Sequence, residues 1–166
     1  MNPISDDNFM KFNNMKKFLF LLTVIVFTIT AHSQSTVQVY DSVLAKDLGA
    51  DEYGMKSYVF VMITPGPNHL EKGALRDSIF RGHRINIGKL AAAGKLVVAG
   101  PFEDNPKSYQ GIFILNVKTI SEAQSLLETD PAIHAKVLNT ELYGWYGSAA
   151  LGEYLKLQKK ITKKQF

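Results

Sequence analysis

The sequence contains no cysteine, so neither a disulfide bond nor a thiol nucleophile contributes to this chain. It also lacks the G-x-S-x-G, P-loop and dinucleotide-binding signatures, so sequence motifs support neither a serine hydrolase nor a nucleotide-dependent enzyme. Asp130 and His134 lie four residues apart, but no third ligand follows at a recognised metal-site spacing. The sequence therefore predicts no cofactor and no metal.

The part of the chain expected to fold also lacks an excess of basic residues, although the formal net charge of the whole chain is +4. Residues 34–155 carry 11 basic and 13 acidic side chains, a net charge of −2. A nucleic-acid-binding domain needs a basic face, so this composition argues against a nucleic-acid partner. Five lysines follow residue 155 and predict a solvated, partly helical tail, with a weak contact to an anionic surface as the alternative.

The N-terminal region has the three parts of a secretory signal peptide. Met15-Lys16-Lys17 supplies positive charge, residues 18–31 are fourteen uncharged and largely apolar residues, and Ala31-His32-Ser33 has small residues at the cleavage positions. A membrane anchor is the alternative, but roughly 18 or more apolar residues are needed to cross a bilayer. We expect cleavage before Gln34, export to the periplasm or beyond, and no stable membrane insertion afterwards.

Four apolar or alternating segments predict the strands of one domain over residues 57–147. They are residues 58–64, 96–102, 111–117 and 140–146. A helix is predicted from a capping box at Asn68 and Glu71 to a left-handed end at Gly94. A second helix is expected over residues 121–127, started by Ser121, and a helical turn over residues 131–137. Residues 34–56 are predicted to be a linker with a short helix near residues 41–46, and residues 148–166 a lysine-rich tail.

The predicted order βαββαβ is that of the α+β ferredoxin-like fold. Its two helices cover one face of the sheet, and the other face carries alternate apolar side chains of all four strands. Large apolar patches are rare on soluble monomers. We therefore expect a homodimer that buries this second face, sheet against sheet.

Candidate chemistry centres on His83 and Asp130. His83 belongs to an apolar stripe of the first helix, and Asp130 precedes Pro131 at a turn. A carboxylate that orients an imidazole makes it an effective general base. The alternatives are a hydrogen-bonded core histidine and a helix N-cap with proline at the first helical position. Arg81 and Arg84 flank the histidine and are candidates for binding an anionic substrate, or are solvated helix residues.

Several short motifs, taken in order, resemble the YCII-related family over about residues 57–147. They are Arg81-x-His83, Gly94 eleven residues later, Ala99-Gly100-Pro101, Gly111, Ser121-Glu122-Ala123 and Asp130-Pro131. The resemblance implies a dimeric α/β barrel with a His-Asp site at His83 and Asp130. Members resemble muconolactone isomerases in fold, and some act in the breakdown of chlorinated aromatic compounds.

One position departs from the family pattern. Ala132 stands where the family often has a bulky aromatic residue, so we expect a wider pocket here. The signal peptide and the lysine-rich tail also lie outside the family domain. The sequence favours an exported, cofactor-independent lyase or isomerase for a small carbonyl or aromatic compound. The alternative is a non-catalytic, dimeric small-molecule-binding protein of the periplasm.

Overall fold

The computed structural model describes residues 39–164, of which residues 41–164 belong to one compact unit. The predicted signal peptide, residues 1–33, lies outside the described residues, as does the start of the linker. Among the helices that the structure does describe, none is long and apolar enough to cross a membrane.

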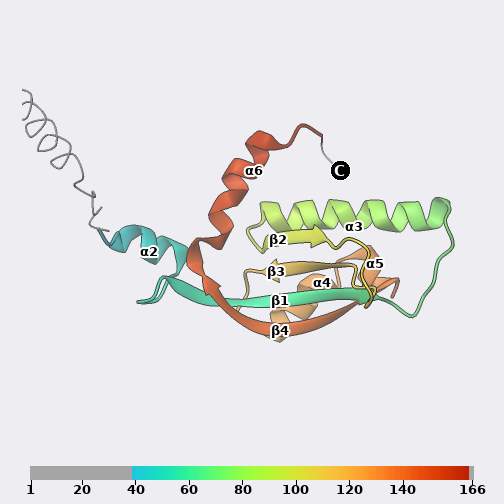
Figure 1. Ribbon diagram of the computed structural model, residues 1–166, viewed down its shortest axis with the longest axis horizontal. Helices are drawn as coiled ribbons and strands as arrows, with labels where there is room; N and C mark the ends of the chain where they lie inside the picture. The colour runs from blue at the N-terminus through green and yellow to red at the C-terminus, as the bar shows by residue number, and fades with distance from the viewer. Residues whose placement is uncertain (1–38, 165–166) are drawn as a thin grey trace, which may run out of the picture. The chain divides into compact units, whose positions relative to one another are not determined.

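One antiparallel sheet of four strands forms the centre of this unit (Figure 1). Its order is β2 (Leu96–Pro101), β3 (Gly111–Leu115), β1 (Met55–Pro65) and β4 (Leu138–Ser148). β1 pairs with β4 along its full length, from Met55 opposite Ser148 to Pro65 opposite Leu138. With the intervening helices, this order is that of the ferredoxin-like fold, so the predicted α+β class is confirmed.

Helices α3 (Ala74–Ala92), α4 (Ile120–Leu127) and α5 (Pro131–His134) contribute to the main core on one face of the sheet. Side chains at alternate strand positions point into this core because the strand repeat is two residues. The strands contribute mainly aliphatic side chains and one phenylalanine, and α3 and α4 each add buried leucine. The buried members include Val59, Val61, Phe113, Leu115, Leu90 and Leu127.

The start of α3 differs from the sequence prediction. The helix begins at Ala74, after Gly73, and its N-terminus has no side-chain cap. Asn68 does not cap it, because its backbone N–H donates to Lys136 O at 3.0 Å and its side-chain amide donates to Ala135 O at 2.7 Å. A pairing between distant segments thus replaces the predicted capping box.

The other helix ends are closer to expectation. Gly94 has a φ of +68° just beyond α3, which confirms the predicted left-handed end. α4 begins one residue earlier than predicted, because Thr119 rather than Ser121 is its N-cap and accepts from Glu122 N at 3.1 Å. In the linker, α2 (Ser42–Leu48) confirms the short helix, with Asp41 as its N-cap.

The first part of the predicted tail is not solvated. A 3₁₀ helix, η1 (Ala149–Tyr154), follows β4 directly, and its Leu151 packs on the second face of the sheet. There it covers a small cluster formed by Tyr58, Val97 and Ile114. The Tyr154 hydroxyl also donates to Val97 O at 2.5 Å. The packed part of the chain therefore continues beyond β4 into η1, whereas none of the residues of the next helix, α6 (Leu155–Ile161), is buried.

The rest of the second face stays open in the single chain. Tyr143 is 53% exposed and Trp145 is 37% exposed, both on β4. Their rings contact aromatic neighbours on β1, with centroid distances of 6.4 Å from Tyr143 to Phe60 and 5.6 Å from Trp145 to Tyr58. The segment after β4 thus covers part of the face that the sequence analysis left entirely to a partner chain.

Removing the Tyr154 hydroxyl should loosen η1 from the sheet. We expect Tyr154→Phe to lower the free energy of unfolding by about 1 kcal/mol, as for loss of one hydrogen bond to a carbonyl. Burial raises the pKa of Tyr154, so the unfolded chain loses the phenolic proton first and stability falls as the pH rises above about 10. Urea unfolding at neutral and alkaline pH measures both effects.

The alkaline loss should be smaller in Tyr154→Phe than in the original chain. Tyr53→Phe is the matched control, because Tyr53 is 77% exposed. Equal stability of the two variants at neutral pH would contradict the anchoring role of Tyr154.

Candidate functional site

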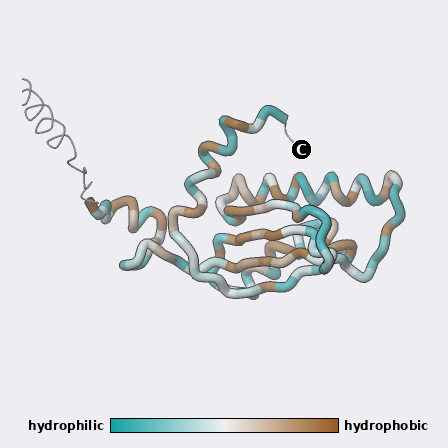
Figure 2. Tube along the Cα trace, viewed as in Figure 1, coloured by the Kyte–Doolittle hydropathy of each residue, from teal (hydrophilic) through white to brown (hydrophobic). Residues whose placement is uncertain are grey.

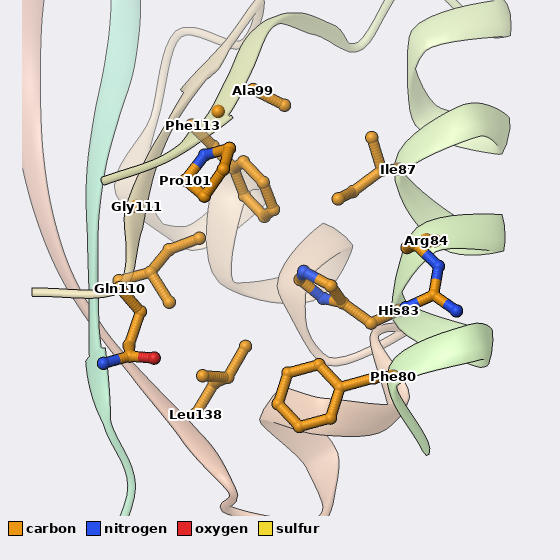
Figure 3. Close-up of a pocket in the computed structure, with 12 residues that line it drawn as sticks. Phe80, His83, Arg84, Ile87, Ala99, Pro101, Gln110, Gly111, Phe113 and Leu138 are labelled. Atoms are coloured by element: carbon orange, nitrogen blue, oxygen red, sulfur yellow. The ribbon is translucent and has the colours of Figure 1, made fainter. Parts of the chain in front are cut away.

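A mainly apolar cavity of about 390 Å³ lies between α3 and strands β2 and β3 (Figure 3). Its size suits a small organic molecule. The side chains from α3 form one wall, and residues of the strands form the other. The lining residues are Ile63, Phe80, His83, Arg84, Ile87, Ala99, Gly100, Pro101, Gln110, Gly111, Phe113 and Leu138.

The His83 imidazole projects from α3 into this space (Figure 3). Its side chain is 13% exposed. Phe80 contacts the ring edge-on, with centroids 6.0 Å apart, and Phe113 stacks on it at the same distance. The two aromatic rings restrict the rotation of the imidazole and keep much of it away from water.

The structure brings His83 and Asp130 together. His83 Nδ1 lies 2.8 Å from Asp130 Oδ2, although the residues are 47 positions apart in the sequence. Asp130 is 1% exposed. Its other oxygen, Oδ1, accepts hydrogen bonds from the backbone N–H groups of Ala132 at 2.9 Å and Ile133 at 3.4 Å. Asp130 therefore caps α5 and contacts the histidine at the same time.

This geometry selects one tautomer of a neutral His83. An ionised carboxylate only accepts hydrogen bonds, so Nδ1 carries the proton that Asp130 accepts. The lone pair then resides on Nε2, the nitrogen that Asp130 does not contact. A histidine oriented in this way, on the wall of an apolar cavity, can take a proton from a bound molecule and return it.

A close contact between α3 and α5 sets this distance. Gly82 precedes His83, and Pro131 follows Asp130. A Cβ atom added to Gly82 would lie 2.8 Å from Pro131 Cγ, which is closer than real Cβ atoms come to a neighbour. The missing side chain at Gly82 therefore lets the two helices approach, and this approach is what brings the adjacent imidazole to the carboxylate.

The two candidate arginines are placed differently. Arg84 lines the cavity, and Figure 3 shows its guanidinium against α3, at the side of the cavity rather than in its middle. Arg81 is exposed and is not among the lining residues. Of the pair, only Arg84 is positioned to contact an anionic group in this cavity.

Ala132 does not widen the pocket. It is completely buried in the main core and lines no part of the cavity, so the expectation that its small size enlarges the site is wrong.

The metal-site candidates are not brought together. His134 is exposed, at 77% of its side chain. Within residues 39–164, no group of three histidine, aspartate or glutamate side chains is arranged to hold a metal ion.

Sequence reasoning missed three contributions to the site. Phe113 faces the helices through the alternation of β3, and this period-two pattern would have placed it beside the stripe of α3. Gln110 comes from the loop before β3, where its backbone N–H donates to Ile63 O at 2.8 Å. Nothing local marks that pairing. The contact of Gly82 with Pro131 likewise depends on packing between distant segments.

Among known structures, the chain matches a solved enzyme in fold only weakly, and the sequence comparisons found no relative. No family model matches the chain, and no curated protein matches it. The chain is similar to 5-chloro-2-hydroxyhydroquinone dehydrochlorinase (TftG) from Burkholderia phenoliruptrix AC1100, solved in complex with 2,5-dihydroxybenzoquinone. The identity is 20%, the TM-score is 0.38, and the match covers 52% of this chain and 92% of the other.

Proposed function

We propose that this protein is a cofactor-independent lyase or isomerase that moves a proton on a small carbonyl or aromatic compound. The observation that carries the proposal is the 2.8 Å contact between His83 Nδ1 and Asp130 Oδ2 on the wall of the apolar cavity. The proposal includes membership of the YCII-related family, on the motifs given above, and export after cleavage before Gln34.

His83 is the general base in this proposal. Nε2 takes a proton from a carbon next to a carbonyl group, and the electron pair of that C–H bond moves toward the carbonyl oxygen. Return of the proton to a different carbon gives an isomer, whereas departure of a leaving group from the neighbouring carbon gives a lyase product. Asp130 stabilises the imidazolium that forms, and Arg84 holds an anionic group of the substrate at the side of the cavity.

Deuterium exchange tests this function without knowledge of the natural substrate. The purified chain is incubated in D₂O with a panel of small carbonyl compounds and hydroxylated aromatic compounds, and carbon-bound deuterium is followed by NMR. We expect deuterium to enter at least one class of probe. At low probe concentration, Arg84→Gln should slow this incorporation. Lys89→Gln is the matched control, because Lys89 is an exposed cation of the same helix outside the cavity.

The same experiment separates the enzyme from a binding protein. If probes bind, as seen by shifts of His83 resonances, but no probe exchanges deuterium or changes chemically, the lyase or isomerase proposal fails. The protein then functions as a non-catalytic small-molecule-binding protein.

The open part of the second sheet face supports a homodimer, which we also propose. Tyr143 and Trp145 are exposed large aromatic residues that η1 leaves uncovered. Two copies packed through this face would bury both residues, and burial of such aromatic area is a main source of stability in interfaces.

Light scattering should give twice the mass of one chain at micromolar concentration. Trp145→Lys should shift the protein toward monomers, because it places a charge in the proposed interface. Tyr53→Lys is the control, since Tyr53 is exposed and lies in the turn before β1 rather than on a strand of the sheet. A folded monomer in the original chain at that concentration would contradict the dimer.

A further inference from the structure

The last described helix, α6 (Leu155–Ile161), has an exposed apolar stripe. Leu157 is 62% exposed and Ile161 is 75% exposed. They are four residues apart, so on a helix with 3.6 residues per turn they lie on the same side. Tyr154, three residues before Leu157, continues this side toward the body of the protein. No other described element covers the two aliphatic side chains, which remain in contact with water.

The remaining surface of the same segment is basic. Residues 154–166 contain five lysines and no acidic residue. On an ideal helix, Lys156 and Lys159 lie away from the apolar stripe and Lys160 flanks it. Within the described residues, Lys156 pairs with Glu153, and no other lysine of this segment has a carboxylate within salt-bridge distance. Figure 2 shows hydrophobic and hydrophilic residues alternating along this helix.

The described residues leave α6 accessible to a flat surface such as a membrane. η1 is the one described element that it contacts extensively, and η1 itself is held to the sheet by Leu151 and by the Tyr154 hydroxyl. α6 therefore projects from a firm attachment point (Figure 1). Its seven residues are too few to cross a bilayer but enough to lie at its surface.

We propose that α6 is a docking surface for an anionic lipid bilayer. Leu157 and Ile161 enter the boundary between head groups and acyl chains, while the lysine side chains extend to the lipid phosphates. Charge decides between this occupant and a second copy of the chain. Residues 34–155 have a net charge of only −2, whereas an anionic membrane presents a dense negative surface to this lysine-rich segment.

Vesicle sedimentation tests the proposal. The chain from Gln34 to Phe166 contains the whole compact unit and leaves out the apolar segment 18–31, which would itself bind lipid. We expect it to sediment with vesicles of phosphatidylcholine and phosphatidylglycerol at low salt. We expect at least tenfold weaker binding to vesicles of phosphatidylcholine alone, and weaker binding at high salt because salt screens charge.

Two variants separate the charged and apolar contributions. Changing all five tail lysines to glutamine should reduce binding to the level seen with phosphatidylcholine. Leu157→Ser combined with Ile161→Ser keeps every charge and should still weaken binding several-fold. Neither variant should change the thermal unfolding midpoint or the proton-exchange activity, because these side chains are exposed and lie outside the cavity.

The matched control removes the same charge from the body of the protein. It changes five exposed lysines to glutamine, namely Lys46, Lys72, Lys89, Lys107 and Lys118. This variant should keep most of the vesicle binding. Equal losses in the tail and body variants, or equal binding to both kinds of vesicle, would overturn the proposal. Conversion of the protein to monomers by the two serine substitutions would assign α6 to contacts between copies and would overturn it too.

Discussion

Replacing His83 by glutamine should abolish most of the proton-exchange activity, with a loss of about 10²–10⁴-fold. Glutamine keeps a polar side chain of similar length on α3 but cannot act as a base at neutral pH. The fold should persist, because the main core is formed by residues other than His83. The measurement is the rate of deuterium incorporation into the best probe at saturating concentration. His134→Gln is the control, because His134 is a largely exposed histidine outside the cavity.

Asp130 acts through the imidazole in this mechanism, so its effect should not add to that of His83. We expect Asp130→Asn to lower the rate in the presence of His83. The double variant should be no slower than His83→Gln alone, as for residues that act as one unit. Stability should change little, because asparagine is also a good N-cap and can keep the contacts to Ala132 N and Ile133 N.

The tautomer of His83 supplies a readout that Asp130 would not give if it acted only as the cap of α5. Nitrogen-15 NMR of the neutral imidazole should show the proton on Nδ1 in the original chain. A shift toward the other tautomer is expected in Asp130→Asn, since the carboxylate acceptor is gone. Additive losses of rate would mean that the two residues do not act as one unit, and an unchanged tautomer would mean that Asp130 does not fix the proton on Nδ1.

The sequence predicted the parts of this site that depend on local patterns. His83 falls on the apolar stripe of a helix that Gly94 ends, and Asp130 precedes a proline that is suited to the first helical position. The strand order then brings the two segments onto the same face of the sheet. The stripe does not reach the start of the helix, because Leu75 in the first turn of α3 is 66% exposed.

Helix geometry explains why only one arginine reaches the cavity. Successive residues of an α-helix are rotated by about 100°, so Arg84 lies about 100° from His83 and Arg81 about 160° from it. Arg81 therefore points nearly opposite to the histidine. The spacing of the two arginines from His83 alone predicts their different directions, whereas their proximity to His83 in the sequence had suggested the same role for both.

Long-range packing accounts for what the sequence did not predict. Asparagine is a common helix cap, yet Asn68 donates its hydrogen bonds to the backbone carbonyl groups of residues 135 and 136 instead. Leu151 and Tyr154 looked like the beginning of a polar tail, but their contacts with the second sheet face exist only after β4 has paired with β1. Such pairings are not encoded within a short window of residues.

Replacing Gly82 by alanine should destabilise the protein, although alanine is the better helix former by up to about 1 kcal/mol. The new Cβ would lie 2.8 Å from Pro131 Cγ, so α3 and α5 must move apart. Overpacking of this kind costs about 1–3 kcal/mol, which exceeds the gain in helix propensity over most of that range. The separation should also lengthen the His83–Asp130 contact and lower the exchange rate.

Gly88→Ala is the matched control for Gly82→Ala, because it makes the same chemical change in the same helix. A Cβ atom at Gly88 meets nothing within 4 Å, so this variant should gain up to about 1 kcal/mol of stability and keep its activity. Urea unfolding of the two variants should thus give changes of opposite sign. If both were stabilised equally, α3 could carry a side chain at residue 82 without moving. The close approach of the helices would then not be what holds the imidazole against the carboxylate.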